Sequence, residues 1–155
     1  MNTGRAIQIE SSDSSQTEQL GERLGQKLKG GEVIELASDL GGGKTTFVRG
    51  LAKGMGSQDM VASPTFTIRR EYHAKALTLY HFDFYRLNEP AGIAYDLAEV
   101  VKKPRSVVVV EWGEIVKNVL PAKRLIIHIK TTGEATRLFK FNVPKSLAYL
   151  LQGLK

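Results

Sequence analysis

The sequence predicts an α/β fold with a mixed central sheet, in which antiparallel hairpins are flanked by helices. An apolar run at residues 33–37 is expected to be a buried strand, and a glycine-rich loop and a segment of helical spacing follow it. Residues 107–112 include four consecutive valines, a pattern typical of a strand buried on both faces in a parallel sheet. Extended runs with short polar links predict two hairpins, 66–71 with 77–84 and 124–130 with 136–143.

The remaining elements complete one domain. Residues 6–10 alternate and predict a strand, and residues 18–29 predict an amphipathic helix that ends at Gly30. In the helix after the glycine-rich loop, Gly54 and Gly56 are expected to break the last turn. Shorter helices are predicted at 93–101 and 146–151, with a turn at 88–90 between the hairpin and the first of them. The length of 155 residues, without an internal repeat or linker, predicts a single domain over 1–155.

Composition excludes several classes of protein. The chain has no cysteine, which excludes disulfides, thiolate zinc sites and a cysteine nucleophile and is consistent with a cytoplasmic protein. The longest apolar runs are far too short to cross a bilayer, and the N-terminus lacks a secretory core, so no membrane partner is expected. The net charge of +6 favours contact with phosphates, and a direct role in nucleic-acid binding stays open as an alternative.

The segment from Ser38 to Thr46 carries the strongest functional signal. Strand, glycine-rich loop ending in Lys-Thr, then helix is the arrangement of a phosphate-binding P-loop. Glycines let main-chain N–H groups turn inward around anionic oxygens, and the positive end of the following helix adds to the attraction. Lys44 would then contact the β and γ phosphates, and the Thr45 hydroxyl would be an oxygen ligand for Mg²⁺.

One position departs from the P-loop pattern. Ser38 stands where the full pattern has its first glycine, and the serine must accept the local main-chain angles and leave room for phosphates. The alternative is a glycine-rich turn that caps an ordinary helix. The sequence Gly-Lys-Thr-Thr between a strand and a helix favours the nucleotide site.

Glu111 follows the valine-rich strand and matches a Walker B carboxylate. The ends of α/β strands are where ligands bind, so Glu111 is a candidate for a second magnesium contact beside the P-loop. The alternative is a charged residue that only marks a strand end. Trp112 is expected either to form a wall of the nucleotide site or to be a partly buried core aromatic.

The segment His-Phe-Asp-Phe-Tyr-Arg at 81–86 supplies another candidate. In an extended chain His81, Asp83 and Tyr85 share one face, and the two phenylalanines share the other. Asp83 is expected to orient a water or act as a base, unless it is a turn or capping carboxylate. For His81 the sequence favours a hydrogen-bonded structural role, and Arg86 fits a phosphate contact or a surface ion pair equally well.

The segment Ser63-Pro64-Thr65 follows the P-loop helix, as a switch segment would. Thr65 would reach the metal or the γ-phosphate in a closed state. A strand-entry turn explains the Ser-Pro pair equally well.

These motifs together resemble one family. Asp-Leu-Gly-Gly-Gly-Lys-Thr-Thr-Phe, Ser-Pro-Thr-Phe-Thr, His-Phe-Asp-Phe-Tyr-Arg-Leu and Glu-Trp occur in this order, and the likeness to the TsaE family covers nearly the whole chain. The resemblance implies a P-loop NTPase-like domain that hydrolyses ATP with Mg²⁺ in tRNA threonylcarbamoyladenosine (t6A) biosynthesis. It also implies a complex with TsaB–TsaD partners, through which the contact with tRNA would be indirect. The stretch at 88–103 follows the family pattern poorly, which affects the surface expected to face partners.

The resemblance carries roles onto particular residues of this chain. Lys44, Asp83 and Glu111 would be catalytic, and Thr45 and Glu111 would hold magnesium. Thr17 and Arg137 fall in loosely matching regions where the family holds the adenine ring. The full set expected to bind ATP or ADP is Thr17, Asp39, Leu40, Gly41, Gly42, Gly43, Lys44, Thr45, Thr46, Trp112 and Arg137.

Competing functions make different demands on the sequence. A small P-loop kinase for nucleotides or small molecules normally needs an arginine-bearing lid, for which the pair Arg69-Arg70 is weak support. A GTPase is disfavoured because the sequence lacks the Asn-Lys-x-Asp motif that reads guanine. A non-catalytic RNA-binding module would bind RNA equally well after the change Lys44→Ala.

Overall fold

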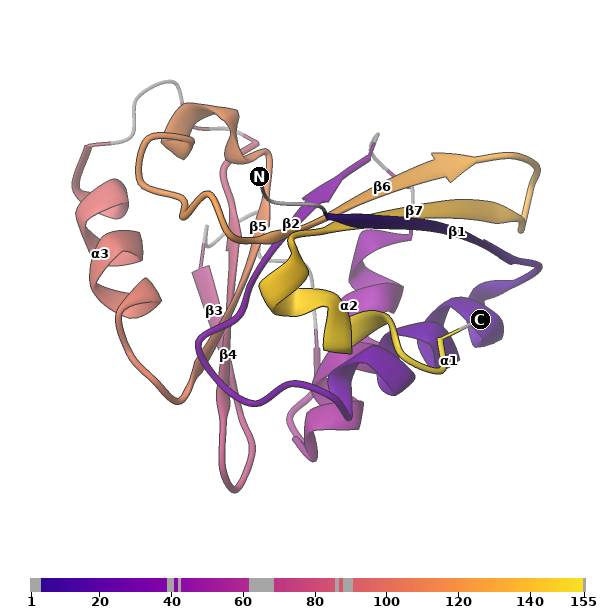
Figure 1. Cartoon of the computed structure of the whole chain (residues 1–155), viewed down its shortest axis with the longest axis horizontal. Coiled ribbons are helices and arrows are strands. Elements are labelled where there is room, and N and C mark those ends of the chain that lie inside the picture. The colour runs from indigo at the N-terminus through magenta and orange to yellow at the C-terminus, as the bar shows by residue number, and fades with distance from the viewer. Residues whose placement is uncertain are drawn as a thin grey trace.

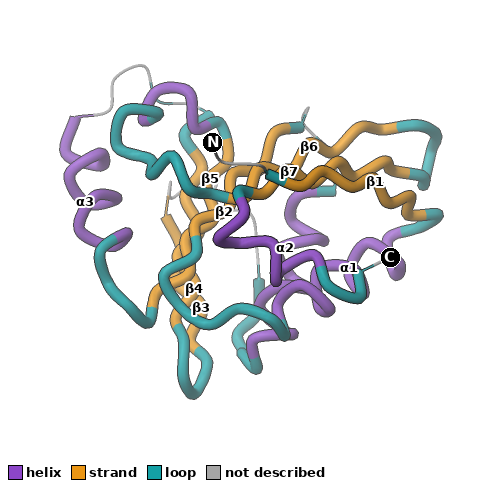
Figure 2. The backbone as a smooth tube through the Cα atoms, viewed as in Figure 1, coloured by secondary structure: helices purple, strands orange, loops and turns teal. Residues whose placement is uncertain are grey.

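The computed structural model describes residues 4–38, 41, 43–61, 69–85, 87 and 91–154. Strands alternate with helices along most of the chain (Figures 1 and 2). The strands are β1 (Arg5–Ser11), β2 (Val33–Ala37), β3 (Arg69–His73), β4 (Thr78–Asp83), β5 (Ser106–Glu111), β6 (Leu125–Thr131) and β7 (Arg137–Val143). The helices are α1 (Ser14–Gly25), α2 (Lys44–Met55), α3 (Ala91–Val101) and two 3-10 helices, η1 (Gly113–Val116) and η2 (Lys145–Leu151).

The strands of the described residues form one seven-stranded sheet in the order β1-β7-β6-β2-β5-β4-β3. Its centre is parallel, with β2 paired to β5 and β6 and with β4 paired to β5. Its flanks are antiparallel, and the predicted hairpins are confirmed as β3–β4 and β6–β7. Strand β1 adds to β7 and forms one edge of the sheet. The mixed α/β architecture predicted from the sequence is therefore the observed one.

The valine-rich strand β5 divides two apolar cores. Val107 and Val109 belong to the core under α1, α2 and η2, whereas Val108 and Val110 belong to the core under α3 and η1. All residues of β5 are buried, which confirms that this strand is covered on both faces. Figure 1 shows the arrangement, with α3 on one side of the sheet and α1, α2 and η2 on the other.

Helices α1 and α2 touch through their backbones because four glycines face the contact. A Cβ on Gly50 would lie 2.1 Å from the carbonyl oxygen of Glu18, and a Cβ on Gly54 would lie 2.1 Å from that of Glu22. The helix α1 contributes Gly21 and Gly25, where a Cβ would lie 2.3 Å from a carbonyl oxygen of α2. No side chain fits at these positions, so the glycines set how closely α1 approaches the helix that follows the P-loop.

This contact corrects one sequence-based expectation. Gly54 does not break α2; it lies inside the helix and packs on α1, and only Gly56 ends the helix, with φ 96°. The first helix also begins before residue 18, because the Asp13 side chain accepts a hydrogen bond from Gln16 N at 2.8 Å and caps it. The predicted C-terminal helix is a 3-10 helix.

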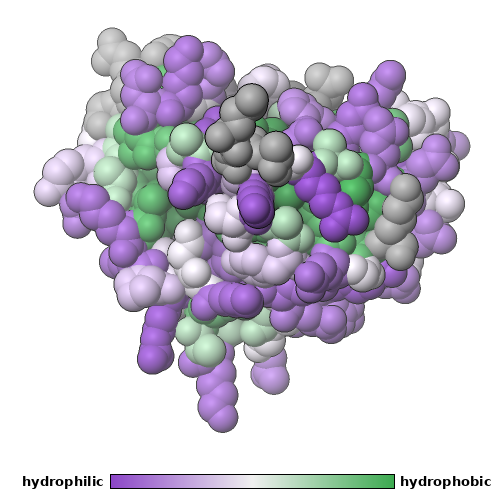
Figure 3. Space-filling model, in the orientation of Figure 1, coloured by the Kyte–Doolittle hydropathy of each residue, from purple (hydrophilic) through white to green (hydrophobic). Residues whose placement is uncertain are grey.

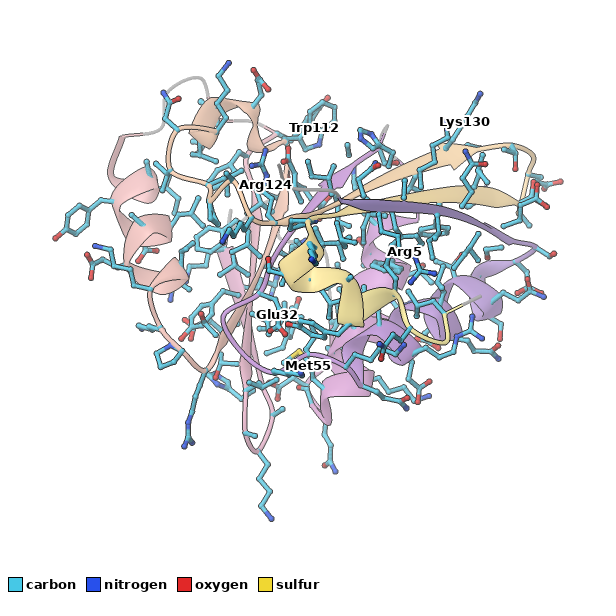
Figure 4. All side chains as sticks on the ribbon, viewed as in Figure 1. Arg5, Glu32, Met55, Trp112, Arg124 and Lys130 are labelled. Atoms are coloured by element: carbon cyan, nitrogen blue, oxygen red, sulfur yellow. The ribbon has the colours of Figure 1, made fainter. Side chains whose placement is uncertain are left out.

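Glu32 anchors the connection between α1 and β2 to the C-terminal helix. Its buried carboxylate accepts hydrogen bonds from Lys29 N and Gly30 N, both at 2.7 Å, and from the Tyr149 hydroxyl at 2.6 Å. Burial raises the pKa of Tyr149, and the hydrogen bond to the Glu32 carboxylate raises it further. Figure 4 shows Glu32 close to η2. The carboxylate thus connects the loop before β2 with η2, which is 117 positions away at Tyr149.

The exterior is mainly polar on the side drawn in Figure 3, where hydrophilic residues cover most of the surface and apolar colour shows in separate patches. Among the described residues, no helix combines the length and apolar character needed to cross a membrane.

The glycine contact generates a stability prediction. Gly50→Ala should destabilise the protein by about 1–3 kcal/mol, because the new methyl group meets main-chain atoms that cannot move aside easily. At about 2–4 °C per kcal/mol for a chain of this size, thermal denaturation followed by circular dichroism should show the loss.

Gly92→Ala is the matched control, because Gly92 also lies in a helix but a Cβ there would meet no atom of the described residues within 4 Å. Its melting temperature should stay the same or rise slightly, since alanine favours helix. Equal melting temperatures for Gly50→Ala and the unaltered protein would contradict the close approach of α1 and α2.

Candidate functional site

The candidate site forms where the parallel strands β2, β5 and β4 end. Since these strands run in the same direction, their carboxyl ends lie at one edge of the sheet, where α/β proteins bind ligands. Glu111 is the register partner of Leu36 on one side and of Asp83 on the other. The structure therefore brings together Glu111 and Asp83, which the sequence indicates separately.

The predicted P-loop follows β2 in the sequence, and Gly41 and Gly43 are its described glycines. Gly41 and Gly43 have φ angles of 77° and 94°, a left-handed conformation that favours glycine, and α2 begins at Lys44. A Cβ on Gly41 would meet no atom of the described residues within 4 Å. Thr45 and Thr46 occupy the first turn of α2, where main-chain N–H groups have no partner within the helix.

Lys44 is the central cation of the site, and its side chain is only 8% exposed. Its Nζ donates to the carbonyl oxygen of Ser38 at 3.2 Å and lies 3.6 Å from Glu111 Oε1. It also lies 5.2 Å from the centre of the Trp112 ring. The contact at Ser38 uses a main-chain oxygen, which any residue supplies, so the absence of glycine at position 38 leaves this interaction intact.

Glu111 is held from two sides. Its carboxylate is 5% exposed, with Oε1 toward Lys44 and Oε2 in contact with His81 Nε2. His81 is fully buried on β4, on the same face of the sheet as Leu79 and as the core under α2. The structural role that the sequence favours for His81 thus has a specific partner, the carboxylate at the end of β5.

Asp83 is buried at the end of β4, and its Oδ1 accepts a hydrogen bond from Tyr85 N at 3.0 Å. The turn is also held by Phe84 N, which donates to the carbonyl oxygen of Glu111 at 3.1 Å. The turn role left open by the sequence is therefore present. The neighbouring Phe82 and Phe84 stack at 5.8 Å in the opposite core, as the alternation of this segment predicts.

Trp112 has φ 57° and ψ 48°, in the left-handed region. A bulky residue in this conformation costs about 1–3 kcal/mol and is found where the surroundings hold it in place. Here the ring packs against Tyr85 with centroids 5.0 Å apart and remains 39% exposed above Lys44. The sequence leaves two roles open for Trp112, and the structure places it at the site rather than in a core.

A cavity of about 350 Å³ opens on the other side of the P-loop. Arg137 lines this cavity and donates to the carbonyl oxygens of Thr136 at 2.9 Å and Gly41 at 3.4 Å. Thr17 also lines the cavity; it is buried and hydrogen-bonded to the Ser11 hydroxyl at 2.7 Å. The residues that line the cavity are Asp13, Ser14, Thr17, Gly41, Gly43, Thr46, Glu134, Ala135 and Arg137.

Thr17 and Arg137, expected only from loosely matching regions, therefore lie together beside the P-loop. Sequence reasoning did not single out Asp13, Glu134 or Ala135 as members of this cavity. Nothing in the sequence alone indicated that Asp13 and the turn between β6 and β7 meet at this cavity. The interaction of His81 with Glu111 was also missed, because it joins residues 30 positions apart.

Several predicted site residues lie outside the described residues. They are Asp39, Leu40, Gly42, Thr65 with its neighbours Ser63 and Pro64, and Arg86.

A metal at this site would draw on few protein ligands. Within the described ranges, no group of three or more His, Cys, Asp or Glu side chains could enclose a metal ion. Thr45 in the first turn of α2 and Glu111 at the end of β5 are oxygen donors of the type that Mg²⁺ accepts. Mg²⁺ usually takes one or two protein ligands and completes its shell with water and phosphate oxygens, so this donor set suits Mg²⁺ bound with a polyphosphate.

Comparison with known proteins identifies the family of the chain. Residues 11–139 match the family model described as threonylcarbamoyl adenosine biosynthesis protein TsaE. The tRNA threonylcarbamoyladenosine biosynthesis protein TsaE of Bacillus subtilis is 42% identical over 114 residues, which cover 73% of this chain and 70% of that protein. The protein of the same name from Treponema pallidum is 38% identical over 127 residues, covering 82% of this chain and 93% of that one.

The fold comparison finds a similar solved structure. The crystal structure of Bacillus subtilis YdiB superposes with a TM-score of 0.80 at 30% sequence identity, and the match covers 99% of this chain and 97% of that chain. The match of the family model over most of the sequence, together with relatives above 30% identity, shows that the chain belongs to the TsaE family.

Proposed function

We propose that this chain is a magnesium-dependent ATP hydrolase that acts with partner proteins in the formation of t6A on tRNA. The position of Lys44 carries the proposal. Its ammonium group is buried at the start of α2, between the end of β2 and the carboxylate of Glu111. A lysine in this place, after glycines of positive φ, is suited to bind the β and γ phosphates of a nucleotide.

The binding part of the mechanism follows from the chain's own groups. The main-chain N–H groups around Gly41, Gly43 and the first turn of α2 would hold the phosphates, with Lys44 as the point charge. Thr45 and Glu111 would hold the magnesium ion, which lowers the charge on the phosphate oxygens during hydrolysis. The cavity beside the P-loop, with Thr17 and Arg137, would accept the base of the nucleotide.

Asp83 is proposed to position the attacking water. It lies in register with Glu111 at the strand ends, and one of its oxygens is fixed by Tyr85 N. That hydrogen bond limits how the carboxylate can rotate, so its orientation toward a water is set before the nucleotide binds.

Partners are proposed because hydrolysis of ATP does not by itself transfer a threonylcarbamoyl group to adenosine. The relatives are named for t6A biosynthesis, so the proteins that carry out the transfer, a complex of the TsaB–TsaD type, are the expected partners. Contact with tRNA would then be indirect. Hydrolysis should be slow for the isolated chain and faster in the presence of these partners.

The kinase alternative receives no support from Arg69. A kinase lid needs an arginine that is free to close over the phosphates. Arg69 is instead held on β3 by Glu71 at 2.9 Å and by Asp96 of α3.

Removal of the Lys44 charge tests the proposal. Lys44→Ala should lower ATP hydrolysis by about 10²–10³-fold, the range seen when one preorganised donor to a transition-state charge is lost. In cells that depend on the altered chain, mass spectrometry of digested tRNA should show that t6A falls.

Lys53→Ala is the control, because Lys53 lies on the same helix with an exposed side chain, 3.9 Å from Glu22. It should hydrolyse ATP and support t6A like the unaltered protein. Normal hydrolysis by Lys44→Ala would contradict the proposed site, and loss of hydrolysis with normal t6A would contradict the proposed role in tRNA modification.

Asp83→Asn separates the chemical role of Asp83 from its role in the turn. Asparagine keeps an oxygen that can accept from Tyr85 N but lacks the charge, so the melting temperature and nucleotide binding should be nearly unchanged. Hydrolysis should fall by about 10²–10⁴-fold, as expected for loss of a general base. Unchanged hydrolysis in a steady-state assay would show that Asp83 only stabilises the turn and has no chemical role.

A further inference from the structure

His81 is a buried polar side chain that the mechanism above does not use. It is 0% exposed, near the carboxyl end of β4 and in register with Val109 of β5. Burial of an imidazole ring without a hydrogen bond is unfavourable. Among the described residues, the ring has one such contact, between Nε2 and Glu111 Oε2.

The hydrogen bonding assigns the proton on the ring. Nε2 faces a carboxylate, which can only accept, so Nε2 must carry the hydrogen. Nδ1 is buried and has no hydrogen-bond partner among the described residues. A buried N–H without an acceptor costs about 1–3 kcal/mol, so the hydrogen at Nε2 and a bare Nδ1 form the favourable arrangement.

The same contact determines where Glu111 can point. Oε2 is taken by His81, which leaves Oε1 on the side of Lys44, 3.6 Å from its Nζ. Without the histidine, this buried carboxylate could turn both oxygens onto the ammonium group. That closer pair would withdraw Glu111 from a metal position and Lys44 from phosphate oxygens.

We infer that His81 is a positioning residue that orients the carboxylate of Glu111 and thereby sets the magnesium requirement of the site. The inference rests on the proposed function, since it assumes that Glu111 contacts the metal. Removal of a residue that hydrogen-bonds to a metal ligand typically weakens metal binding by about 10–100-fold. The loss of His81 should weaken nucleotide binding in the presence of magnesium and leave the nucleotide affinity without metal unchanged.

The test uses two substitutions at one position. His81→Leu fills the buried space with an apolar group that cannot donate, whereas His81→Gln retains an N–H donor. ADP binding is measured by calorimetry in EDTA and in excess MgCl₂, and ATP hydrolysis is measured across a magnesium titration. His73→Leu is the control, because His73 is exposed on β3, where its main-chain N–H donates to Asp59.

His81→Leu should bind ADP in EDTA like the unaltered protein and need about 10–100-fold more magnesium for half-maximal hydrolysis. His81→Gln should recover most of the difference, and His73→Leu should show none. An unchanged magnesium requirement in His81→Leu would overturn the inference. Equal losses in EDTA and in magnesium would also overturn it, because they indicate general damage to the loop. Failure of the proposed function is distinct, since the unaltered protein would then neither bind nor hydrolyse ATP.

A measurement on the unaltered protein covers the case in which His81→Leu does not fold. The chain has three histidines, so nitrogen NMR of ¹⁵N-labelled imidazoles can resolve each ring. The His81 ring should carry its hydrogen on Nε2 and none on Nδ1. A hydrogen on Nδ1 would show that the ring does not donate to Glu111 as inferred.

Discussion

The buried ion pair between Lys44 and Glu111 is the interaction on which the site depends. Both side chains are almost completely removed from water, and a buried charge is strongly unfavourable unless an opposite charge and hydrogen bonds compensate it. Each partner has such compensation, from the Ser38 carbonyl for the lysine and from His81 for the glutamate. Helix α2 and the ends of β2, β4 and β5 are thereby joined through a few polar atoms.

This pair also explains why a divalent cation suits the site. Asp83 and Glu111 place two carboxylates in register at the strand ends, against one lysine on α2. A triphosphate brought to this position would add further negative charge. Magnesium bound with the proposed nucleotide would offset that repulsion, and Thr45 and Glu111 stand on the two elements that meet there.

The backbone contact of α1 with α2 has a consequence for the second half of the site. The contact sets how closely α1 approaches α2, and the first turn of α1 carries Thr17 to the cavity beside Gly43. The β6–β7 hairpin reaches the same cavity through Arg137, which donates to the Gly41 carbonyl. A nucleotide base there would touch three segments that are far apart in the sequence, whereas the phosphates would meet one contiguous loop.

That difference explains how much the sequence alone could predict. Both hairpins and the doubly buried β5 follow local patterns, and the structure confirms them. The P-loop, Glu111 and Asp83 also follow local rules of strand ends, glycine conformation and charge, so they could be proposed as site residues without a structure. Gly54 was misjudged because its role is set by a neighbouring helix rather than by helix propensity. The positions of Asp13 and Glu134 at the cavity and the contact of His81 with Glu111 depend on tertiary packing. No local sequence pattern indicates them.

The most direct measurement is a calorimetric titration of the isolated chain with ATP and with ADP, each in the presence and absence of magnesium. We expect one nucleotide to bind per chain. Magnesium should strengthen the binding of ATP more than that of ADP, because ATP brings the larger negative charge toward Asp83 and Glu111. The absence of heat from either nucleotide with magnesium present would contradict a nucleotide site at Lys44.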